Sequence, residues 1–241
     1  MFFIKKKKIV LEAYAPSGSL IDLFPITKSS DALPQWYDKL PAKVNGDKTV
    51  KHCPGLKDLY NTGIMIPSWA DFEMAIAPDD SGYIKSGMNK KYGTPAEGHD
   101  LSVQAPSAWP GYVNVKLINP WLFWCSEPID WLWVQPAWSQ TDPQEITLIP
   151  AVTEFRYQYQ ANINTITKKP TQTKIITITG GTPLAHLVPL TERDWELKLD
   201  VMTPEIYAKK FDRWDFSLSQ NTGYNKIRSV INRKNKQLCK Y

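Results

Sequence analysis

The chain has 241 residues, of which 42% are hydrophobic and 22% are charged, which is typical of a globular protein and excludes a wholly disordered or fibrous one. Its 29 lysines and arginines outnumber its 24 acidic residues, giving a formal net charge of +5. Six of the basic residues follow Asp215, after which no acidic residue occurs, so the positive charge is concentrated in the C-terminal tail.

Cysteine usage and the first residues bear on the compartment. Cys53, Cys125 and Cys239 include no closely spaced pair, so they predict neither a disulfide framework nor a zinc cage and fit a reducing compartment. The apolar residues 1–4 precede Lys5–Lys8, which reverses the order of a secretory signal. The longest apolar run has five residues, so we expect a protein that is neither secreted nor membrane-spanning.

The N-terminal quarter combines one predicted strand with two predicted helices. Lys5–Lys8 lies among apolar residues, and lysines in a strand are typical of a protected edge strand, which we prefer to a nucleic-acid patch. Residues 33–40 form one predicted helix, closed by Pro41. Residues 54–61 form the second, with Pro54 in the first turn and Gly63 beyond the end.

From residue 113 onward, apolar and polar residues alternate in short runs separated by prolines and glycines. This pattern predicts short antiparallel strands and leaves no room for crossover helices. We therefore expect a mainly β fold, either an antiparallel β-sandwich or a jelly-roll, cupin-like barrel, with a few short helices. The predicted strands are 113–117, 131–134, 155–159, 174–179 and 195–199.

Tryptophans gather in the middle of the chain, at positions 109, 121, 124, 131, 133 and 138. Trp131 and Trp133 share one strand face, and Leu132 and Val134 take the other, which predicts a central strand covered on both sides. We expect the indoles to fill a core with each N–H hydrogen-bonded. The alternative is an exposed aromatic groove for a glycan, a peptide or a protein.

The C-terminal part predicts a helical extension. Thr203 is a candidate cap, Pro204 and Glu205 suit a first turn, and apolar residues recur at helical spacing up to Leu218. We therefore divide the chain into a β body, 1–202, with its short helices near 33–40 and 54–61, and a basic helical extension, 203–241. The candidate partner-binding residues of this extension are Arg228, Arg233, Lys234 and Lys236.

Catalytic motifs are sparse. The sequence has no glycine-rich phosphate loop and no serine hydrolase elbow, and Cys125 is expected to be a buried small hydrophobe. Acidic residues that flank the aromatic strands would suit glycoside hydrolysis only if two of them faced each other, which the sequence does not establish. These residues are Glu127, Asp130, Asp142, Glu145 and Glu154.

A metal centre is the main catalytic alternative. Glu97 and His99 lie two residues apart, so in a strand they face the same side, and His186 would reach them from another strand. With Asp100 as a further candidate ligand, this set suggests non-haem iron in a cupin-like oxygenase of the 2-oxoglutarate type. His99 is followed directly by Asp100, which departs from the usual His-x-Asp order, and the default interpretation of isolated histidines is packing or surface.

Several blocks of the chain resemble known sequences. They are His52-Cys53-Pro54-Gly55-Leu56, Pro67-Ser68-Trp69, Pro120-Trp121, Gly181-Thr182-Pro183-Leu184 and Pro189-Leu190. In this order they resemble uncharacterised proteins of marine tailed phages and a bacterial family of unknown function, over roughly residues 50 to 215. The resemblance implies a phage-associated protein, a virion component or host-takeover factor in the virion or the host cytoplasm, and it implies no catalytic residue.

We therefore expect a phage-type structural or binding protein that acts through contacts with other protein subunits, without a cofactor. The first alternative is the iron oxygenase. The second is a nucleic-acid-binding protein that uses Lys5–Lys8 and the basic tail, for which steep salt dependence is expected.

Overall fold

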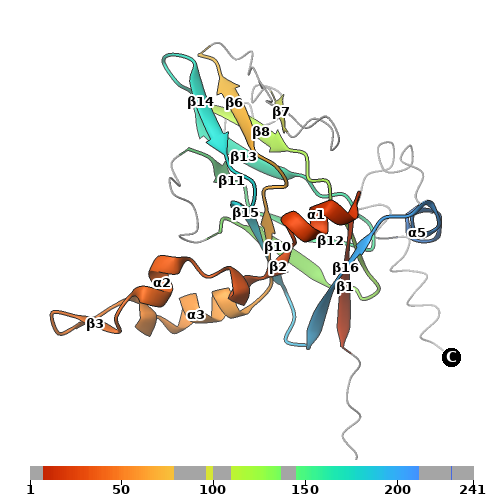
Figure 1. Cartoon of the computed structure of the whole chain (residues 1–241), viewed down its shortest axis with the longest axis horizontal. Helices are drawn as coiled ribbons and strands as arrows, with labels where there is room; N and C mark the ends of the chain where they lie inside the picture. Colours follow the sequence, from red (N-terminus) through yellow and green to blue (C-terminus); the bar gives the residue numbers. More distant parts are fainter. Residues whose placement is uncertain (1–7, 79–95, 100–109, 137–144, 212–228, 230–241) are drawn as a thin grey trace, which may run out of the picture.

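A computed structural model of the chain describes residues 8–78, 96–99, 110–136, 145–211 and 229 (Figure 1). Its helices are α1 (Gly18–Leu23), η1 (Ser29–Ala32), α2 (Gln35–Lys39), η2 (Val50–His52), α3 (Pro54–Asn61) and α5 (Pro204–Lys210). Its first strands are β1 (Ile9–Ala15), β2 (Thr27–Lys28), β3 (Lys43–Val44), β4 (Asp47–Lys48), β5 (Ile64–Pro67), β6 (Phe72–Ile76), β7 (Ala96–His99) and β8 (Tyr112–Leu117). The remaining strands are β9 (Leu122–Cys125), β10 (Asp130–Val134), β11 (Thr147–Leu148), β12 (Ala151–Glu154), β13 (Ile163–Lys168), β14 (Lys174–Ile178), β15 (Pro183–Pro189) and β16 (Trp195–Val201).

The fold is mainly β, with several sheets and few helices, as the sequence predicts. The three larger sheets have the strand orders β16-β1-β9, β12-β10-β15-β5-β2 and β11-β13-β8-β7, and β14-β6 and β3-β4 form two-stranded pairs. In the described part of the chain each sheet has two different end strands, so the closed barrel was wrong, and the jelly-roll arrangement of the strands stays a prediction. Buried side chains from all three larger sheets and from β6 and β14 join in one hydrophobic core.

The N-terminal strand departs from the prediction in two ways. β1 lies between β16 and β9, so the strand that follows the lysine run is central and not the predicted edge strand, while Lys5–Lys7 themselves lie outside the described residues. Lys8 is exposed just before the strand, and Ile9, Leu11 and Ala13 are fully buried within it. The pairing of β1 with β16 is parallel, with Ile9 opposite Trp195, so the sheets are not purely antiparallel.

Four of the five predicted strands are confirmed as β8, β10, β14 and β16. The strand predicted at 155–159 was wrong, because β12 ends at Glu154 and the chain then turns, with the Tyr157 N–H donating to the Glu154 carbonyl at 3.0 Å. Phe155 and Tyr157 are buried all the same. Two inward-facing aromatic residues of a turn therefore reproduced the alternation of a strand.

The indoles of Trp121, Trp131 and Trp133 are buried, which confirms the predicted core. Trp133 donates its Nε1–H to the Thr153 hydroxyl at 2.8 Å. The expectation that every indole N–H is hydrogen-bonded was wrong, since the Nε1 atoms of Trp121 and Trp131 have no partner among the described residues. Trp109 and Trp138 lie outside the described residues. β10 is central, between β12 and β15, and Leu132 and Val134 on its second face are half-buried.

The predicted helix 54–61 is confirmed as α3, and α2 falls within the predicted 33–40. The predicted cap of α5 is also confirmed, because the Thr203 hydroxyl accepts a hydrogen bond from the Ile206 N–H at 3.2 Å. The helical pattern beyond Phe211, up to Leu218, lies outside the described residues.

The start of the C-terminal extension packs against the three-stranded sheet. Phe211 is buried, with its ring centroid 5.9 Å from that of Tyr14 and 5.0 Å from that of Tyr159. The Lys210 ammonium bonds to the Glu12 carboxylate, lies 2.6 Å from the Tyr14 hydroxyl and sits 4.3 Å from the centroid of Trp124. Burial lowers the pKa of Lys210.

Candidate functional site

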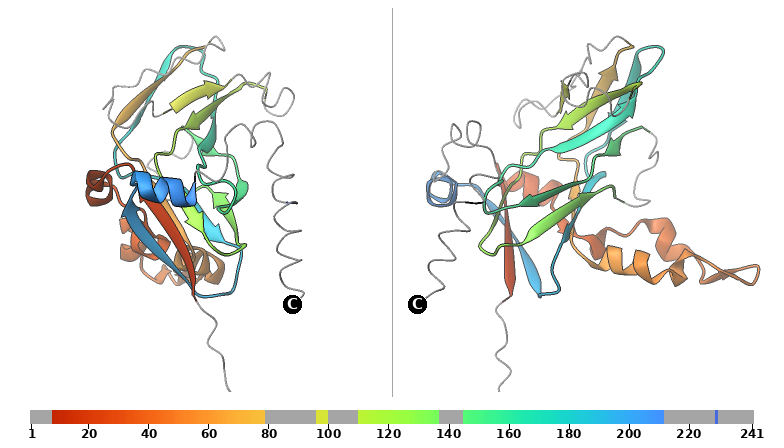
Figure 2. Two further views of the ribbon diagram at one scale, coloured as in Figure 1. Left: turned by 90° about the vertical axis from the view of Figure 1, so that its right-hand side faces the viewer. Right: turned by 180° about the vertical axis from the view of Figure 1, so that it is seen from behind.

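Residues 29–63 leave the β body as a single projection, which we call the arm. It contains η1, α2, the β3–β4 hairpin, η2 and α3, and it extends away from the sheets in both Figure 1 and the rear view of Figure 2. Its two ends meet where β2 pairs with β5, with Lys28 opposite Ile64. The arm is therefore carried on an edge of the five-stranded sheet.

The base of the arm is held by hydrogen bonds of two buried residues, Ser29 and His186. The Ser29 N–H donates to the Gly63 carbonyl at 3.1 Å, and the Ser29 hydroxyl donates to the Thr62 carbonyl at 2.9 Å. His186, from β15 beneath the arm, is fully buried and lies with its Nε2 2.7 Å from the Thr62 carbonyl oxygen. Because a carbonyl only accepts, Nε2 carries the proton.

Local sequence explains the elements of the arm. Pro34 precedes α2, Pro41 follows it, and Pro54 opens α3, so prolines mark the helix boundaries. The hairpin turns at Asn45-Gly46, where both residues have positive φ, 51° and 89°, as a two-residue type I′ turn requires. This hairpin was not predicted, although Asn-Gly between short strands is its recognised signal.

An aromatic pair joins the two helices of the arm. Tyr37 of α2 and Tyr60 of α3 are buried, and their ring centroids lie 6.1 Å apart. The Tyr60 hydroxyl has no hydrogen-bond partner among the described residues, and burial, followed by the neighbouring Tyr37, raises the pKa of Tyr60 to about 12. Tyr60 is therefore a neutral phenol at physiological pH.

Beside this pair lies an open cavity of about 250 Å³. The Lys51 ammonium donates to the Asp38 carbonyl at 2.8 Å and lies 5.8 Å from the centroid of Tyr37. The cavity thus combines aromatic walls with cationic groups. Its lining residues are Leu33, Tyr37, Lys51, Lys57, Tyr60 and Asn61.

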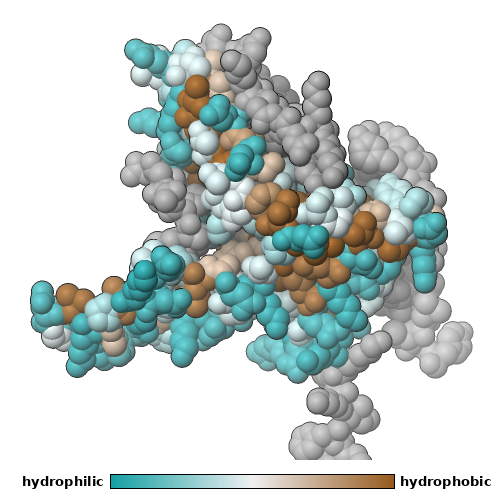
Figure 3. Space-filling view, viewed as in Figure 1, coloured by the Kyte–Doolittle hydropathy of each residue, from teal (hydrophilic) through white to brown (hydrophobic). Residues whose placement is uncertain are grey.

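The outer surface of the arm is mainly hydrophilic, with separate apolar spots (Figure 3). Two large apolar side chains of the arm are well exposed, Trp36 at 42% and Val44 at 47%. The Trp36 ring centroid lies 5.8 Å from that of Tyr37, so an exposed indole adjoins a ring that lines the cavity.

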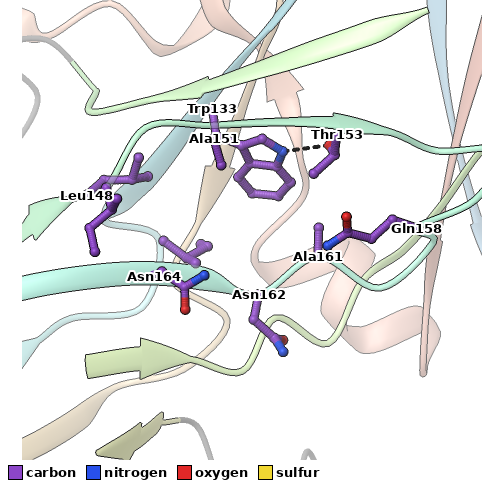
Figure 4. Close-up of a pocket in the computed structure, with 10 residues that line it drawn as sticks. Trp133, Leu148, Ala151, Thr153, Gln158, Ala161, Asn162 and Asn164 are labelled. Atoms are coloured by element: carbon purple, nitrogen blue, oxygen red, sulfur yellow. Dashed lines mark hydrogen bonds between the residues drawn. The ribbon is translucent and has the colours of Figure 1, made fainter. Parts of the chain in front are cut away.

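A second, smaller cavity of about 50 Å³ lies in the β body beside Trp133 and Thr153 (Figure 4). The amide side chains of Gln158, Asn162 and Asn164 are among its lining groups. A space of this size holds a few water molecules at most. We therefore regard the arm, and not this cavity, as the candidate site.

The candidate iron ligands are not brought to one sheet. β7, which carries Glu97 and His99, belongs to the four-stranded sheet, whereas His186 lies on β15 of the five-stranded sheet. Asp100 lies outside the described residues. Within those residues no group of three or more His, Cys, Asp or Glu side chains is arranged to hold a metal ion. Since Nε2 of His186 donates to Thr62, a metal would have to bind Nδ1, and the iron site stays a prediction.

The flanking carboxylates do include a facing pair. Asp130 and Glu154 are register partners on β10 and β12, and the buried Glu154 carboxylate forms an ion pair with Arg156. Glu127 pairs with Arg193 at 3.1 Å, and Glu145 pairs with Lys174 at 3.2 Å. Asp142 lies outside the described residues. Glu127 and Glu145 thus join segments that are distant in the sequence, whereas Glu154 pairs with a residue of its own turn.

Two other predictions concern Cys125 and the tail. Cys125 is fully buried, and burial is the main cause that raises the pKa of its thiol, which supports the interpretation as a packed small side chain and not a nucleophile. The four predicted partner-binding residues, Arg228, Arg233, Lys234 and Lys236, lie outside the described part of the chain.

The arm's attachment is expected to weaken as the pH falls. Burial lowers the pKa of His186 below its ordinary value of 6.5, so the unfolded chain takes up this proton more readily than the folded one. The contribution of His186 to the free energy of unfolding should therefore be constant above about pH 7 and should decrease as the pH falls from about 6 to 5. Urea titrations at several pH values check this, with His186→Gln expected to flatten the slope. An equal slope in both proteins would contradict it.

The described helices are each too short or too polar to cross a bilayer. In comparisons with protein-family models, curated proteins and solved structures, the chain matches none of them.

Proposed function

We propose that this chain is a structural or binding protein that acts through protein contacts, and that the arm makes them. The observation that carries the proposal is the projection of residues 29–63 from the β body, with Trp36 and Val44 exposed on it. An exposed tryptophan among polar residues is typical of the centre of a protein interface.

The way the arm is attached supports the same function. Its base is fixed by the β2–β5 pairing, by the Ser29 hydrogen bonds and by His186, and its helices are joined by the Tyr37–Tyr60 pair. An arm that is ordered before it meets a partner loses less conformational entropy on binding. We also propose that the body is a β-sandwich of the jelly-roll kind and that it holds the arm rigidly.

Site-specific photo-cross-linking tests the proposal. A benzophenone amino acid replaces Trp36 on the arm or, as a matched control, Ile175 on β14, which is also exposed. In the cells that make the chain, we expect one protein to cross-link at position 36 and not at 175. The purified partner should then bind the purified chain, and Trp36→Ala should weaken this binding at least about tenfold, as for an interface hot spot. A partner whose affinity is unchanged by Trp36→Ala would refute the arm as the contact.

The first partners to test are virion subunits, because the sequence blocks resemble those of tailed-phage proteins. If the chain is a virion component, mass spectrometry of purified particles should find it at a fixed copy number. Its absence from particles would restrict the proposal to an accessory binding protein.

A further inference from the structure

The cavity of the arm holds two ammonium groups that have no acidic partner in the described part of the chain. Lys51 donates one hydrogen bond, to the Asp38 carbonyl, and Lys57 is exposed to solvent. Neither forms an ion pair with a carboxylate within the described residues, whereas Lys174, Lys198 and Lys210 elsewhere in the molecule each do. An ammonium has three donors, so Lys51 keeps two for a ligand.

The walls of the cavity are apolar or neutral. The rings of Tyr37 and Tyr60 are buried, Leu33 is half-buried, and Tyr60, whose pKa burial raises further above its ordinary value of 10, is uncharged. The cavity therefore presents positive charge beside low-polarity surface, where an ion pair is stronger than in open water. The complementary ligand is an anion on a short apolar stem.

The neighbourhood of the cavity indicates a peptide and not a free ion. Trp36 exposes its indole next to Tyr37, just outside the cavity lining, so a peptide that reaches the lysines has an apolar surface for a neighbouring residue. A small inorganic anion would leave this surface unused. A volume of about 250 Å³ is large enough to admit one carboxylate side chain.

We propose that the cavity binds an aspartate or glutamate side chain of a partner protein, with the neighbouring apolar residues of that partner on Trp36. The carboxylate accepts hydrogen bonds from the ammonium groups of Lys51 and Lys57. This inference rests on the proposed function, because it states the chemistry of the partner that the arm contacts.

Lysine-selective NMR on the whole, unsubstituted chain locates the binding, and variants are needed only to assign the signals. Labelling the lysines with ¹³C and ¹⁵N leaves all three N–H donors of each ammonium in place, and the side-chain signals of Lys51 and Lys57 are assigned with Lys51→Arg and Lys57→Arg. The probe is the acetylated and amidated pentapeptide Leu-Glu-Leu-Glu-Leu, with Leu-Gln-Leu-Gln-Leu as its neutral match. We expect the acidic peptide to shift both signals saturably and the neutral one to bind at least tenfold more weakly. Equal shifts with both peptides would overturn the proposal.

A pair of double variants separates the site from general charge attraction. Lys51→Gln with Lys57→Gln removes two charges from the cavity, and Lys43→Gln with Lys48→Gln removes two from the exposed hairpin of the same arm. With a rhodamine-labelled acidic peptide, fluorescence anisotropy should show at least a tenfold loss of affinity for the first variant and less than a threefold loss for the second. Equal losses would overturn the proposal, as would inorganic phosphate that displaces the peptide at equal concentration.

The two proposals fail differently. Cross-linking at position 36 to a partner, without binding of the acidic peptide, would support the arm contact and refute the acidic ligand. Binding of the peptide at Lys51 and Lys57, without a partner at position 36, would support the anion site and refute the arm contact.

Discussion

Gly63→Ala is expected to destabilise the chain by at least about 3 kcal/mol, because the alanine would suffer both backbone strain and a steric clash. Gly63 ends the arm with a φ of +96°, a conformation that alanine adopts only with strain. A Cβ added there would lie 2.0 Å from the Leu187 carbonyl oxygen and 3.2 Å from His186 Nε2. The Leu187 backbone is held in the β15–β5 ladder opposite Ile64, so it has little room to retreat. Urea unfolding of both proteins measures the difference.

Gly46→Ala is the matched control for this prediction. Gly46 also has a positive φ, +89°, but a Cβ there would meet nothing within 4 Å. It should therefore cost only the conformational strain, about 1 kcal/mol. If the two variants lost the same stability, the close packing of the arm's base on β15 would be contradicted.

The elements that the sequence predicted well depend on local signals. In α3, a proline in the first turn and a glycine beyond the last residue set the boundaries, and in α5 Thr203 caps the first turn within the same few residues. The sequences of β8 and β14 alternate apolar with polar residues, and the apolar residues Val113, Val115, Leu117, Ile176 and Ile178 are buried. Such signals do not require knowledge of the rest of the chain.

The arm and the central position of β1 were not predicted, because both depend on pairings between distant segments. The arm exists because Lys28 and Ile64 are paired, 36 positions apart. The parallel pairing of β1 joins Ile9 to Trp195, near the other end of the described chain. A strand's own residues do not specify which strand lies beside it, so the lysine run suggested an edge where the fold has a centre.

The same limit applies to the candidate site. His186 was singled out as a metal ligand from its residue type, whereas its neighbour in the fold is the Thr62 carbonyl, 124 positions away. The lysines and tyrosines of the arm cavity carry no spacing that marks a site. The one overlooked local signal is Asn45-Gly46, which predicts the hairpin and, with the two flanking helices, a projecting segment.

Phe155→Ala is expected to cost about 3–5 kcal/mol, although the residue lies in a turn. Its ring is stacked on Phe123 at a centroid distance of 4.7 Å and lies 6.0 Å from Trp131 and 6.4 Å from Trp133. Deletion of this ring would open a cavity between side chains of β9 and β10, which the rest of the core cannot fill without breaking the sheets. Phe155→Leu fills most of the space and should cost less than half as much.

Val152→Ala serves as the control for Phe155, since Val152 belongs to β12, just before the same turn, and is half exposed. It should change the free energy of unfolding by less than about 1 kcal/mol. The turn, for which the sequence pattern predicted a strand, would then be part of the core, because its first residue, Phe155, packs among the indoles. A Phe155→Ala cost no larger than that of Val152→Ala would contradict this arrangement.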